Sequence, residues 1–395
     1  MKRGSICLLN FLPMTFKRVI HQITYKVYHA VSLEKLAIWA TTLCLCSLVL
    51  SLYICLHFSA LPKELNKIFF RDNFNMQLQV HFLDVGQGDA IYIKAPNTNS
   101  LLIDSGPPNE KVITEIYKFK NIFERNISAL LITHADADHI GSMKKIIENF
   151  NYQAFLFSGL ESNTDLFKNL MQTAKSRNHS DKSNNANNQI YILTAGMSLI
   201  LDSERDIKFE VLFPDFEYQI AMYKKCIEKN SNNLNSKARV SKGTCLRYLD
   251  LETNLNSIVG KLSYGSTSFM LTGDAPTEVE KFLISKYDIT YLKTMKGGEE
   301  NFYTLHSNRL DSDILKLGHH GSKTSTSDEF MQSVSPQYVV VSSGKDNRYG
   351  HPHKKVLEII EKYKNEHSDF KDVLRTDVVG TISFYSDGSD ISVNP

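Results

Sequence analysis

A run of 21 uncharged residues, from 36 to 56, sets the first limit on how this chain of 395 residues can fold. At about 1.5 Å per residue, a helix of that length spans roughly 31 Å, the thickness of the hydrocarbon core of a bilayer. A helix buried in a globular core would keep a polar stripe, and this run has none. The sequence therefore predicts a single transmembrane helix over 36–57.

The charges around this run predict its orientation. Only one acidic residue, Glu34, precedes the run, against six basic ones, which are Lys2, Arg3, Lys17, Arg18, Lys26 and Lys35. By the positive-inside rule, the basic segment 1–35 then lies in the cytoplasm. We expect a single-pass protein of the inner (cytoplasmic) membrane, in which a linker over 58–75 leads to a large domain over 76–395 outside, on the periplasmic side.

Composition places that domain among ordinary globular proteins. The whole chain has 45 Lys and Arg against 43 Asp and Glu, and the part after residue 35 has 39 against 42. The overall charge therefore gives no sign of a nucleic-acid-binding protein. Six cysteines occur without a C-x-x-C pair, which excludes a cysteine-based zinc site.

Apolar strands alternate with amphipathic helices over 76–395, which predicts an α/β domain. Hairpins are expected over 76–95, 254–274 and 381–393, single strands over 101–104, 128–133, 313–318 and 334–343, and helices over 140–150 and 354–365. Two polar segments, 175–189 and 225–243, are expected to be surface loops, and 293–311 is expected to be irregular.

Four potential metal ligands follow the strand 128–133 within six positions. They are His134, Asp136, Asp138 and His139. A loop with this spacing brings imidazole and carboxylate groups to one point without help from the rest of the fold, which indicates a metal site. The alternative is structural: Asp136 or Asp138 would cap the following helix, and both histidines would be solvated.

This motif resembles the second motif of the metallo-β-lactamase superfamily, H-x-H-x-D-H, with Asp136 in place of the second histidine. In this form it is similar to the hydrolase domain of ComEC-type competence DNA-uptake proteins. Further matches follow in chain order: FLDVGQGD (82–89), LIDSG (102–106), NSIV (256–259), LTGD (271–274), GHHGS (318–322), and a segment over 343–352 that ends in YGHP. The resemblance implies a metallo-β-lactamase-type αββα sandwich, preceded here by the transmembrane helix.

The same resemblance implies a centre of two divalent metal ions. Its ligands would be the four residues of the motif, Asp274 as a bridge between the ions, and one of His319 and His320. Because successive strand residues face opposite sides, we expect only one of these two histidines to reach the metal. The residues that would support the ligands are Asp84, Asp104, Asn256 and Ser257. A ligand set this rich in oxygen suits Mn²⁺ as well as Zn²⁺.

The chemistry expected of such a centre is hydrolysis assisted by metal ions. Asp138 and Asp274 would be catalytic carboxylates that hold the ions, and His351 would bind or protonate the leaving group. A phosphate-bearing substrate is favoured by the basic and aromatic residues near the last ligands, which are Lys323, Lys345, Arg348 and Tyr349. The alternative is a solvated helix start and a charged surface loop.

Together these features predict a membrane-anchored, metal-dependent phosphodiesterase or nuclease. The resemblance implies that it degrades one DNA strand during uptake, with single-stranded DNA as the substrate. ComEC-type proteins also carry a channel of several membrane spans, so a chain with one span would need a separate channel protein. Two alternatives stay open: a hydrolase of small phosphoesters or choline-phosphate groups, and a metal-binding interaction module without turnover.

Overall fold

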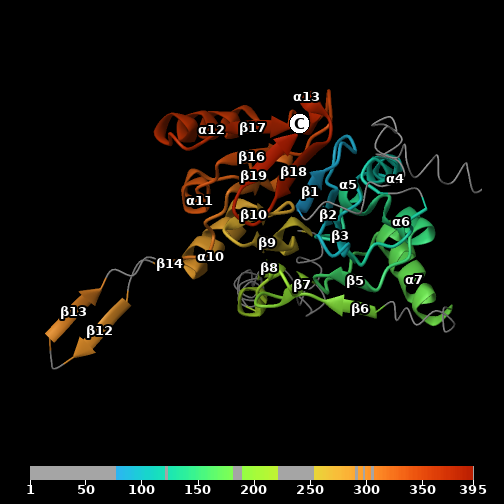
Figure 1. Ribbon diagram of the computed structural model, residues 1–395, viewed down its shortest axis with the longest axis horizontal. Helices are drawn as coiled ribbons and strands as arrows, with labels where there is room; N and C mark the ends of the chain where they lie inside the picture. The colour runs from blue at the N-terminus through green and yellow to red at the C-terminus, as the bar shows by residue number, and fades with distance from the viewer. Residues whose placement is uncertain are drawn as a thin grey trace, which may run out of the picture. The chain divides into compact units, whose positions relative to one another are not determined.

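Two mixed β-sheets packed face to face form the centre of the fold (Figure 1). The computed structural model describes residues 77–120, 123–180, 189–220, 253–289, 292–296, 299–303 and 307–394. All of these belong to one unit of the chain, Arg71–Pro395. No helix within these ranges is long and apolar enough to cross a bilayer. The predicted transmembrane helix over 36–57 and the loop over 225–243 lie outside the described residues.

The first sheet combines antiparallel and parallel pairs. Its strands are β1 (Leu78–Phe82), β2 (Ile91–Lys94), β3 (Ser100–Ile103), β4 (Ala129–Leu131), β5 (Ala154–Phe157), β6 (Gln189–Ile192), β18 (Ile382–Ser386) and β19 (Ile391–Asn394). They lie in the order β19-β18-β1-β2-β3-β4-β5-β6. Pairing is antiparallel from β19 to β3 and parallel from β3 to β6.

The second sheet is built in the same mixed way. Its strands are β7 (Ser198–Asp202), β8 (Ile207–Phe213), β9 (Val259–Tyr264), β10 (Thr267–Leu271), β15 (Ile314–Lys316), β16 (Tyr338–Val341) and β17 (Asp372–Arg375), in the order β17-β16-β15-β10-β9-β8-β7. Pairing is antiparallel from β7 to β10 and parallel from β10 to β17. Two short ribbons complete the strands: β11 (Asp288–Ile289) with β14 (Ser307–Asn308), and β12 (Leu292–Lys296) with β13 (Glu299–Tyr303).

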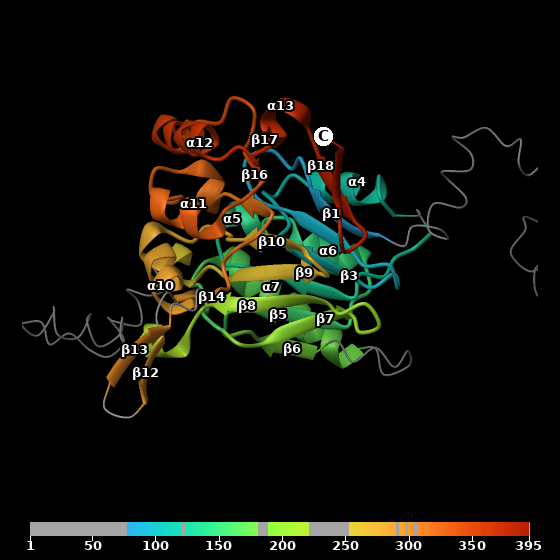
Figure 2. The same cartoon turned by 60° about the vertical axis from the view of Figure 1, so that its left-hand side comes forward.

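Helices cover the outer face of each sheet, which makes four layers (Figures 1 and 2). On the first sheet lie α4 (Lys111–Tyr117), α5 (Ala137–Ile140), α6 (Met143–Asn149) and α7 (Asp165–Ser180). On the second lie α10 (Thr277–Tyr287), α11 (Asp328–Val334) and α12 (Lys354–Glu366). A short helix, α13 (Thr376–Val379), precedes β18. The predicted αββα order of layers is therefore observed.

The apolar pattern of the strands accounts for these layers. In β2, Ile91 and Ile93 face the core between the sheets, whereas Tyr92 belongs to the core under the helices. Neighbouring strand residues point to opposite faces, so a strand covered on both sides must be apolar throughout. Aromatic rings fill the space between the sheets, with Phe384 edge-on to Phe82 and Phe269 at centroid distances of 5.9 and 5.8 Å.

Most expected elements are present, and three differ from the prediction. The predicted helix over 140–150 is two helices, α5 and α6. The segment 175–189 is not a loop from its start, because α7 continues to Ser180. The segment 293–311 is not irregular throughout, since it contains β13, β14 and most of β12. In the latter two cases a polar sequence predicts a loop, although the backbone adopts regular secondary structure.

The core between the sheets gives a stability prediction. Replacing Phe269, which is 1% exposed, with alanine removes a ring packed between both sheets. We expect the free energy of unfolding to fall by about 3–5 kcal/mol. Chemical denaturation of the full chain measures this. Phe216→Ala, at a ring that is 67% exposed, is the control and should change stability by less than about 0.5 kcal/mol; equal effects of the two changes would contradict the packing described here.

Candidate metal centre

The candidate site lies where strands of both sheets end. Asp104 directly follows β3, and His134, Asp136, Asp138 and His139 follow β4 and enter α5. From the second sheet, Asp274 follows β10, His319 and His320 follow β15, and His351 comes from the loop after β16. Parallel strands end at the same edge of a sheet, so residues far apart in sequence meet here.

Asp104 organises the part of the site that the first sheet contributes. Its backbone is left-handed, with φ of 58°, and its carboxylate accepts hydrogen bonds from the backbone N–H of Thr133 (2.8 Å), the Thr133 hydroxyl (2.7 Å) and His139 Nδ1 (2.7 Å). The Thr133 hydroxyl in turn accepts from His134 Nδ1 at 3.0 Å. One carboxylate therefore sets the ring orientation and tautomer of both histidines.

Three imidazoles present the same nitrogen to one point. His320 Nδ1 donates to the carbonyl oxygen of Ser342 at 2.9 Å, so it joins His134 and His139 in using Nδ1 for orientation. The Nε2 atoms of all three are buried and, among the described residues, have no hydrogen-bond partner. A buried polar atom without a partner is costly, and a metal ion is what a neutral Nε2 lone pair can bind.

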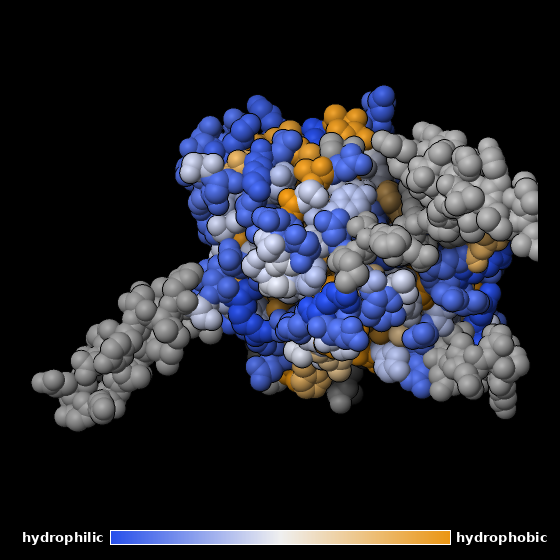
Figure 3. All heavy atoms as spheres, in the orientation of Figure 1, coloured by the Kyte–Doolittle hydropathy of each residue, from blue (hydrophilic) through white to orange (hydrophobic). Residues whose placement is uncertain are grey.

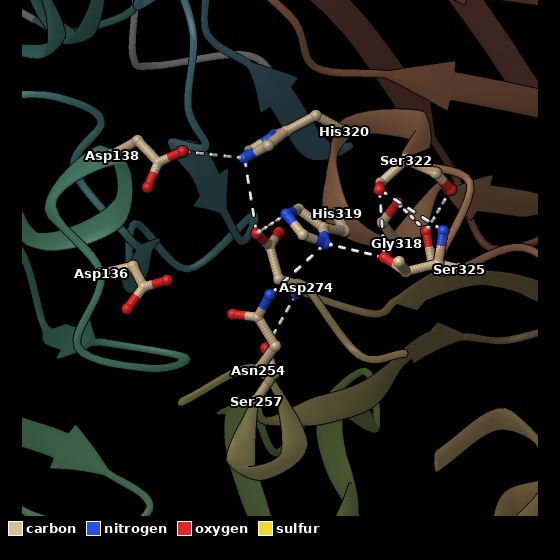
Figure 4. A network of polar contacts seen from close by, with 12 residues as sticks. Asp136, Asp138, Asn254, Ser257, Asp274, Gly318, His319, His320, Ser322 and Ser325 are labelled. Carbon is tan, nitrogen blue, oxygen red and sulfur yellow. Dashed lines mark hydrogen bonds and ion pairs between the residues drawn. The ribbon is translucent and has the colours of Figure 1, made fainter. Parts of the chain in front are cut away.

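These nitrogens converge on the Asp274 carboxylate. His139 Nε2 lies 3.3 Å from Asp274 Oδ1, and His320 Nε2 lies 3.5 Å from Asp274 Oδ2 and 3.3 Å from Asp138 Oδ2. Figure 4 shows His320 facing both carboxylates. Ligands at about 2.0–2.1 Å around a tetrahedral metal are roughly 3.3 Å apart. The spacing of Asp138, His139, Asp274 and His320 therefore fits one divalent ion.

A second group also approaches the Asp274 carboxylate. His134 Nε2 is 3.6 Å from Asp136 Oδ2 and 3.9 Å from Asp274 Oδ2. Asp136 accepts a hydrogen bond from the Thr253 hydroxyl at 2.6 Å, and although it precedes α5, its side chain makes no capping hydrogen bond. The capping alternative for Asp136 is thus not what the structure shows. Both groups thus contain a histidine within 4 Å of the Asp274 carboxylate, and the combined donor set fits divalent metal ions.

The expectation that only one of His319 and His320 reaches the metal rested on an assumption about the backbone that the structure does not bear out. It assumed that both continue a strand, but β15 ends at Lys316 and both histidines lie in a tight turn, Gly318–Gly321, with φ of 47° and 56°. Both Nε2 atoms approach Asp274 Oδ2, at 3.8 Å from His319 and 3.5 Å from His320. They differ in burial, since the His319 side chain is 29% exposed and that of His320 1%.

Backbone packing holds Asp274 in place. Its N–H donates to the Ser257 hydroxyl at 2.8 Å, and this hydroxyl also lies 3.5 Å from His134 Nδ1. Gly273 has φ of 51°, and a Cβ there would lie 2.2 Å from Ser257 Oγ. Asn256 is buried beside the same turn and lines a small cavity with His134 and Thr253. The predicted support from this turn is thus close to the ligands.

Asp84 lies outside the cluster of ligands. Its carboxylate accepts the N–H of Gly86 at 3.1 Å, and its own N–H donates to the Thr381 hydroxyl at 2.8 Å. Instead, Asp89 from the same loop lies beside the site: Asp89 Oδ1 is 3.3 Å from His320 Nδ1, and its other oxygen forms an ion pair with Lys316. In this loop Asp84 shapes the turn and Asp89 contacts the ligands.

The residues predicted to contact substrate fall into two groups. The His351 ring lies 5.6 and 6.3 Å from the rings of His319 and His320 and stacks on Tyr349 at 5.7 Å. The Arg348 guanidinium lies over the Tyr349 ring, 5.0 Å from its centroid. Lys323 instead lines a groove beside α12, and Lys345 is exposed in the loop after β16. The structure thus brings three of the five residues together.

Sequence reasoning missed three residues of this site. Thr133 connects His134 to Asp104, Thr253 holds Asp136, and Lys316 contacts Asp89. The first two look like ordinary strand-end and loop threonines. Lys316 gave a clearer signal, because a lysine inside the apolar strand DILKLG must find a partner when the strand is buried.

The charges of the site shift several pKa values. Burial alone would lower the pKa of the His139 and His320 imidazoles, but Asp274 and the other nearby carboxylates raise it well above 6.5 for His139 and to about 10 for His320. Burial would raise the pKa of Asp274 and Asp138, and the histidines hold both below the usual value. For His351, burial and the neighbouring imidazoles lower the pKa to about 4.

Comparison with known proteins agrees with this geometry. A family model described as the metallo-β-lactamase superfamily matches residues 83–165, which carry Asp104 and the ligands from His134 to His139. ComE operon protein 3 of Bacillus subtilis (strain 168) is 26% identical over 324 residues, which are 78% of this chain and 33% of that protein. Over the matched residues, the chain is similar to the metallo-β-lactamase superfamily.

Competence protein ComA of Neisseria gonorrhoeae is 35% identical to this chain over 135 residues, or 34% of this chain and 16% of ComA. The chain thus spans about a third or less of the length of these curated relatives. Among solved structures, the metallo-β-lactamase fold protein YhfI from Bacillus subtilis covers 80% of this chain and 100% of its own, at 8% identity and a TM-score of 0.39. The chain is thus similar to the metallo-β-lactamase superfamily and to proteins named for competence, and it carries a buried His and Asp cluster that fits a metal ion.

The role of Asp104 gives a prediction about metal affinity. Asp104→Asn keeps the shape of the side chain but removes the charge that holds the Nδ1 protons of His139 and, through Thr133, His134. We expect metal affinity to fall by about 10–100-fold, measured by calorimetric titration of the full chain. Asp387→Asn, at an exposed turn carboxylate that accepts backbone N–H groups, should leave the affinity unchanged. An Asp104→Asn protein with normal affinity would contradict the orienting role.

The raised pKa values predict how metal binding depends on pH. In the metal-free protein at pH 8, His320, with a pKa of about 10, still carries the proton that Nε2 must lose to bind an ion, whereas ordinary histidines near 6.5 are already neutral. The pKa of His139 is raised in the same direction. Metal affinity should therefore rise with pH up to about 10, by about tenfold per pH unit for each proton displaced. Titration calorimetry at pH 8 in buffers of different protonation enthalpy should show release of about one proton or more; release near zero would contradict these shifts.

Proposed function

We propose that this chain is a phosphodiesterase that acts on DNA as a metal-dependent nuclease. The observation that carries the proposal is the convergence of three unpartnered Nε2 atoms and the carboxylates of Asp136 and Asp138 on Asp274. This donor set fits two divalent ions that share one carboxylate, and oxygen ligands make Mn²⁺ as suitable as Zn²⁺. Pairs of divalent ions are a common device for hydrolysis of phosphodiesters.

Bound in this way, the two ions would supply an acidified water and neutralise the charge that develops on the attacked phosphodiester. The chain's own residues do the rest. Asp138, His139 and His320 would hold one ion, His134 and Asp136 would hold the other, and Asp274 would contribute its carboxylate to both. Because Asp104 orients two of the rings before any ion arrives, little reorganisation is needed on binding.

His351 is suited to hold the substrate. Its pKa of about 4 means that the ring is neutral near pH 7, so it has no spare proton to give to a leaving group. Its backbone is fixed by Asn347, which accepts the His351 N–H at 2.9 Å and donates to the His351 carbonyl at 2.6 Å. Of the two roles expected from sequence, hydrogen bonding to the substrate is therefore favoured over proton donation. Tyr349, 54% exposed, offers a face on which a base can stack.

A groove beside the metal-binding loop supports a polymeric substrate. It has a volume of about 480 Å³, and its lining includes the basic residues Lys323, Lys355 and Lys362, the acidic residues Asp328, Glu329 and Glu358, and the apolar side chains of Val356 and Ile359. Thr324, next to Lys323, contacts His319 Nδ1 at 3.2 Å, so the groove lies directly behind the ligand turn. Figure 3 shows mostly hydrophilic residues over α11 and α12, the helices that border this groove.

The lysines of this groove are available to phosphate groups. Lys362 pairs with Asp328 at 2.7 Å, and Glu358 pairs with Lys354 at 3.6 Å. Within the described ranges, neither Lys323 nor Lys355 forms an ion pair. One phosphodiester could thus lie at the metal centre while a neighbouring phosphate meets these two ammonium groups.

The cellular setting is part of the same proposal. The predicted helix over 36–57 would anchor the nuclease in the inner membrane with its domain outside, on the periplasmic side. Two relatives are named for competence or for the ComE operon, which supports degradation of one DNA strand during uptake. A separate channel protein would then carry the surviving strand across the membrane.

Cleavage of single-stranded DNA tests the proposed function. The full chain, purified in a mild detergent, is stripped of metal and reloaded with Mn²⁺ or Zn²⁺, and cleavage of a labelled oligonucleotide is measured. We expect cleavage to require the metal and to be lost in His139→Ala, since this change removes a ligand. His367→Ala, at the C-terminal end of α12, is the control and should cleave DNA normally.

The other results of this experiment identify the alternatives. If metal binds and DNA stays intact, while bis(p-nitrophenyl) phosphate or p-nitrophenylphosphorylcholine is hydrolysed, the protein is a hydrolase of small phosphoesters or choline-phosphate groups. If metal binds and no ester is cleaved, it is an interaction module without turnover. Either result contradicts the nuclease.

The groove gives a separate prediction about DNA binding. In Lys323→Gln/Lys355→Gln, the affinity for a single-stranded oligonucleotide should fall at low salt. The slope of log affinity against log salt should become shallower by about 0.7 for each phosphate that is no longer neutralised, or about 1.4 for two phosphates. Fluorescence anisotropy across a salt series measures this. Lys364→Gln, on the same helix outside the groove, should keep the original slope, and an unchanged slope in the double variant would exclude the groove as a DNA path.

A further inference from the structure

A buried lysine lies directly beneath the metal centre. Lys316, the last residue of β15, has no exposed surface. Its ammonium forms an ion pair with Asp89 Oδ2, donates to the carbonyl oxygen of Gly273 at 2.9 Å, and lies 3.9 Å from Asp274 Oδ1. Three oxygen atoms therefore surround one positive charge, which is the environment that a hard metal cation also prefers.

The place that Lys316 occupies has the composition of a metal site. One ligand atom from each of Asp89, His139, Asp274 and His320 lies within 4.8 Å of the others. Asp89, however, is on the Nδ1 side of the imidazoles: it is 3.3 Å from His320 Nδ1 and 4.0 Å from His139 Nδ1. The Nε2 atoms point away from it, to Asp274. Asp89 thus adds negative charge behind the ligands without belonging to either group that faces an ion.

The charges of the centre balance only when Lys316 is included. Five carboxylates each lie within 3.6 Å of an imidazole nitrogen of the centre. They are Asp89, Asp104, Asp136, Asp138 and Asp274. The Lys316 ammonium reduces their five negative charges to four, which is the charge of two divalent ions. Without it, one negative charge would be left over in a buried site, where an uncompensated charge is costly.

We propose that the Lys316 ammonium is a built-in cation that takes the place of a further metal ion beneath the centre and so limits the centre to two divalent ions. This inference rests on the two-ion centre of the proposed function. Lys316 is a positioning residue: it holds Asp89 on the Nδ1 side, away from the ions, and lowers the negative charge that Asp274 presents to them.

If Lys316 acts through its charge, removing the ammonium and removing the Asp89 carboxylate should have opposite effects on metal binding. Removing the ammonium leaves the Asp89 carboxylate without its partner and attractive to a cation. Removing the Asp89 charge leaves an ammonium 3.9 Å from Asp274 Oδ1, where it repels incoming ions. A purely structural role would weaken metal binding in both cases, because either change leaves one buried charge unpaired.

Metal binding by the full chain in detergent separates these accounts, with Mn²⁺ as the probe in calorimetric titration and metal analysis after desalting. For Lys316→Met, an apolar side chain of similar length, we expect three Mn²⁺ ions per chain in place of two. For Asp89→Asn, we expect two ions bound at least about tenfold more weakly than in the wild type. The double variant Asp89→Asn/Lys316→Met should return to two ions, bound more tightly than in Asp89→Asn alone.

The outcomes distinguish this inference from the proposed function. If the wild type binds no Mn²⁺, the two-ion centre itself fails, whatever the variants do. If the wild type binds two ions and both single variants bind fewer or bind more weakly, Lys316 has a structural role only and the inference is overturned. If circular dichroism shows that Lys316→Met does not fold, the double variant decides. Two ions bound more tightly than in Asp89→Asn support the charge account, and equal or weaker binding contradicts it.

Discussion

The carboxylate of Asp104 is the contact on which the rest of the site depends. It accepts hydrogen bonds from the backbone and hydroxyl of Thr133 and from His139 Nδ1. Each of these donors belongs to the chain that follows β4, so one side chain at the end of β3 fixes the whole loop of ligands. The left-handed backbone of Asp104 turns the chain at the point where it leaves the strand. Without this carboxylate, His134 and His139 would lose the hydrogen bonds that orient their rings and aim their Nε2 atoms at the same point.

The two sheets contribute different parts of the centre. The first supplies the ligand loop and Asp104, and the second supplies Asp274, His320 and the charge of Lys316. The core between the sheets therefore does more than stabilise the fold, because it sets the distance between the halves of the site. Such a site is preorganised by packing, and the energy needed to bring like charges together comes from folding.

Much of this was predictable from sequence, for a physical reason. The residues from His134 to His139 are local, so their spacing alone indicates that they meet. Asp274 and one of His319 and His320 could be added through a family resemblance, without a choice between the two histidines. The strands were predictable because apolar alternation and short polar ends are properties of the sequence itself. Asp104 was predicted as support, but its direct bond to His139 depends on how β3 and β4 pair.

The parts that could not be predicted depend on long-range contacts or on exact backbone angles. The expectation about His319 and His320 rested on extending a strand beyond Lys316, where the structure has positive φ angles in place of strand alternation. Thr133 and Thr253 acquire roles only through tertiary neighbours. Strand β13 and the end of α7 have sequences without an apolar pattern, so their regular backbone structure could not be predicted. The predicted membrane helix over 36–57 lies outside the described residues and stays a prediction.

The central claim is that two ions share Asp274 and are bound through Nε2 atoms. Anomalous diffraction from crystals of the full chain grown with Mn²⁺ tests this most directly. The account predicts two anomalous peaks on either side of the Asp274 carboxylate, one next to His139 and His320 and the other next to His134. A single peak, or a peak on the Nδ1 side beside Asp89, would contradict it.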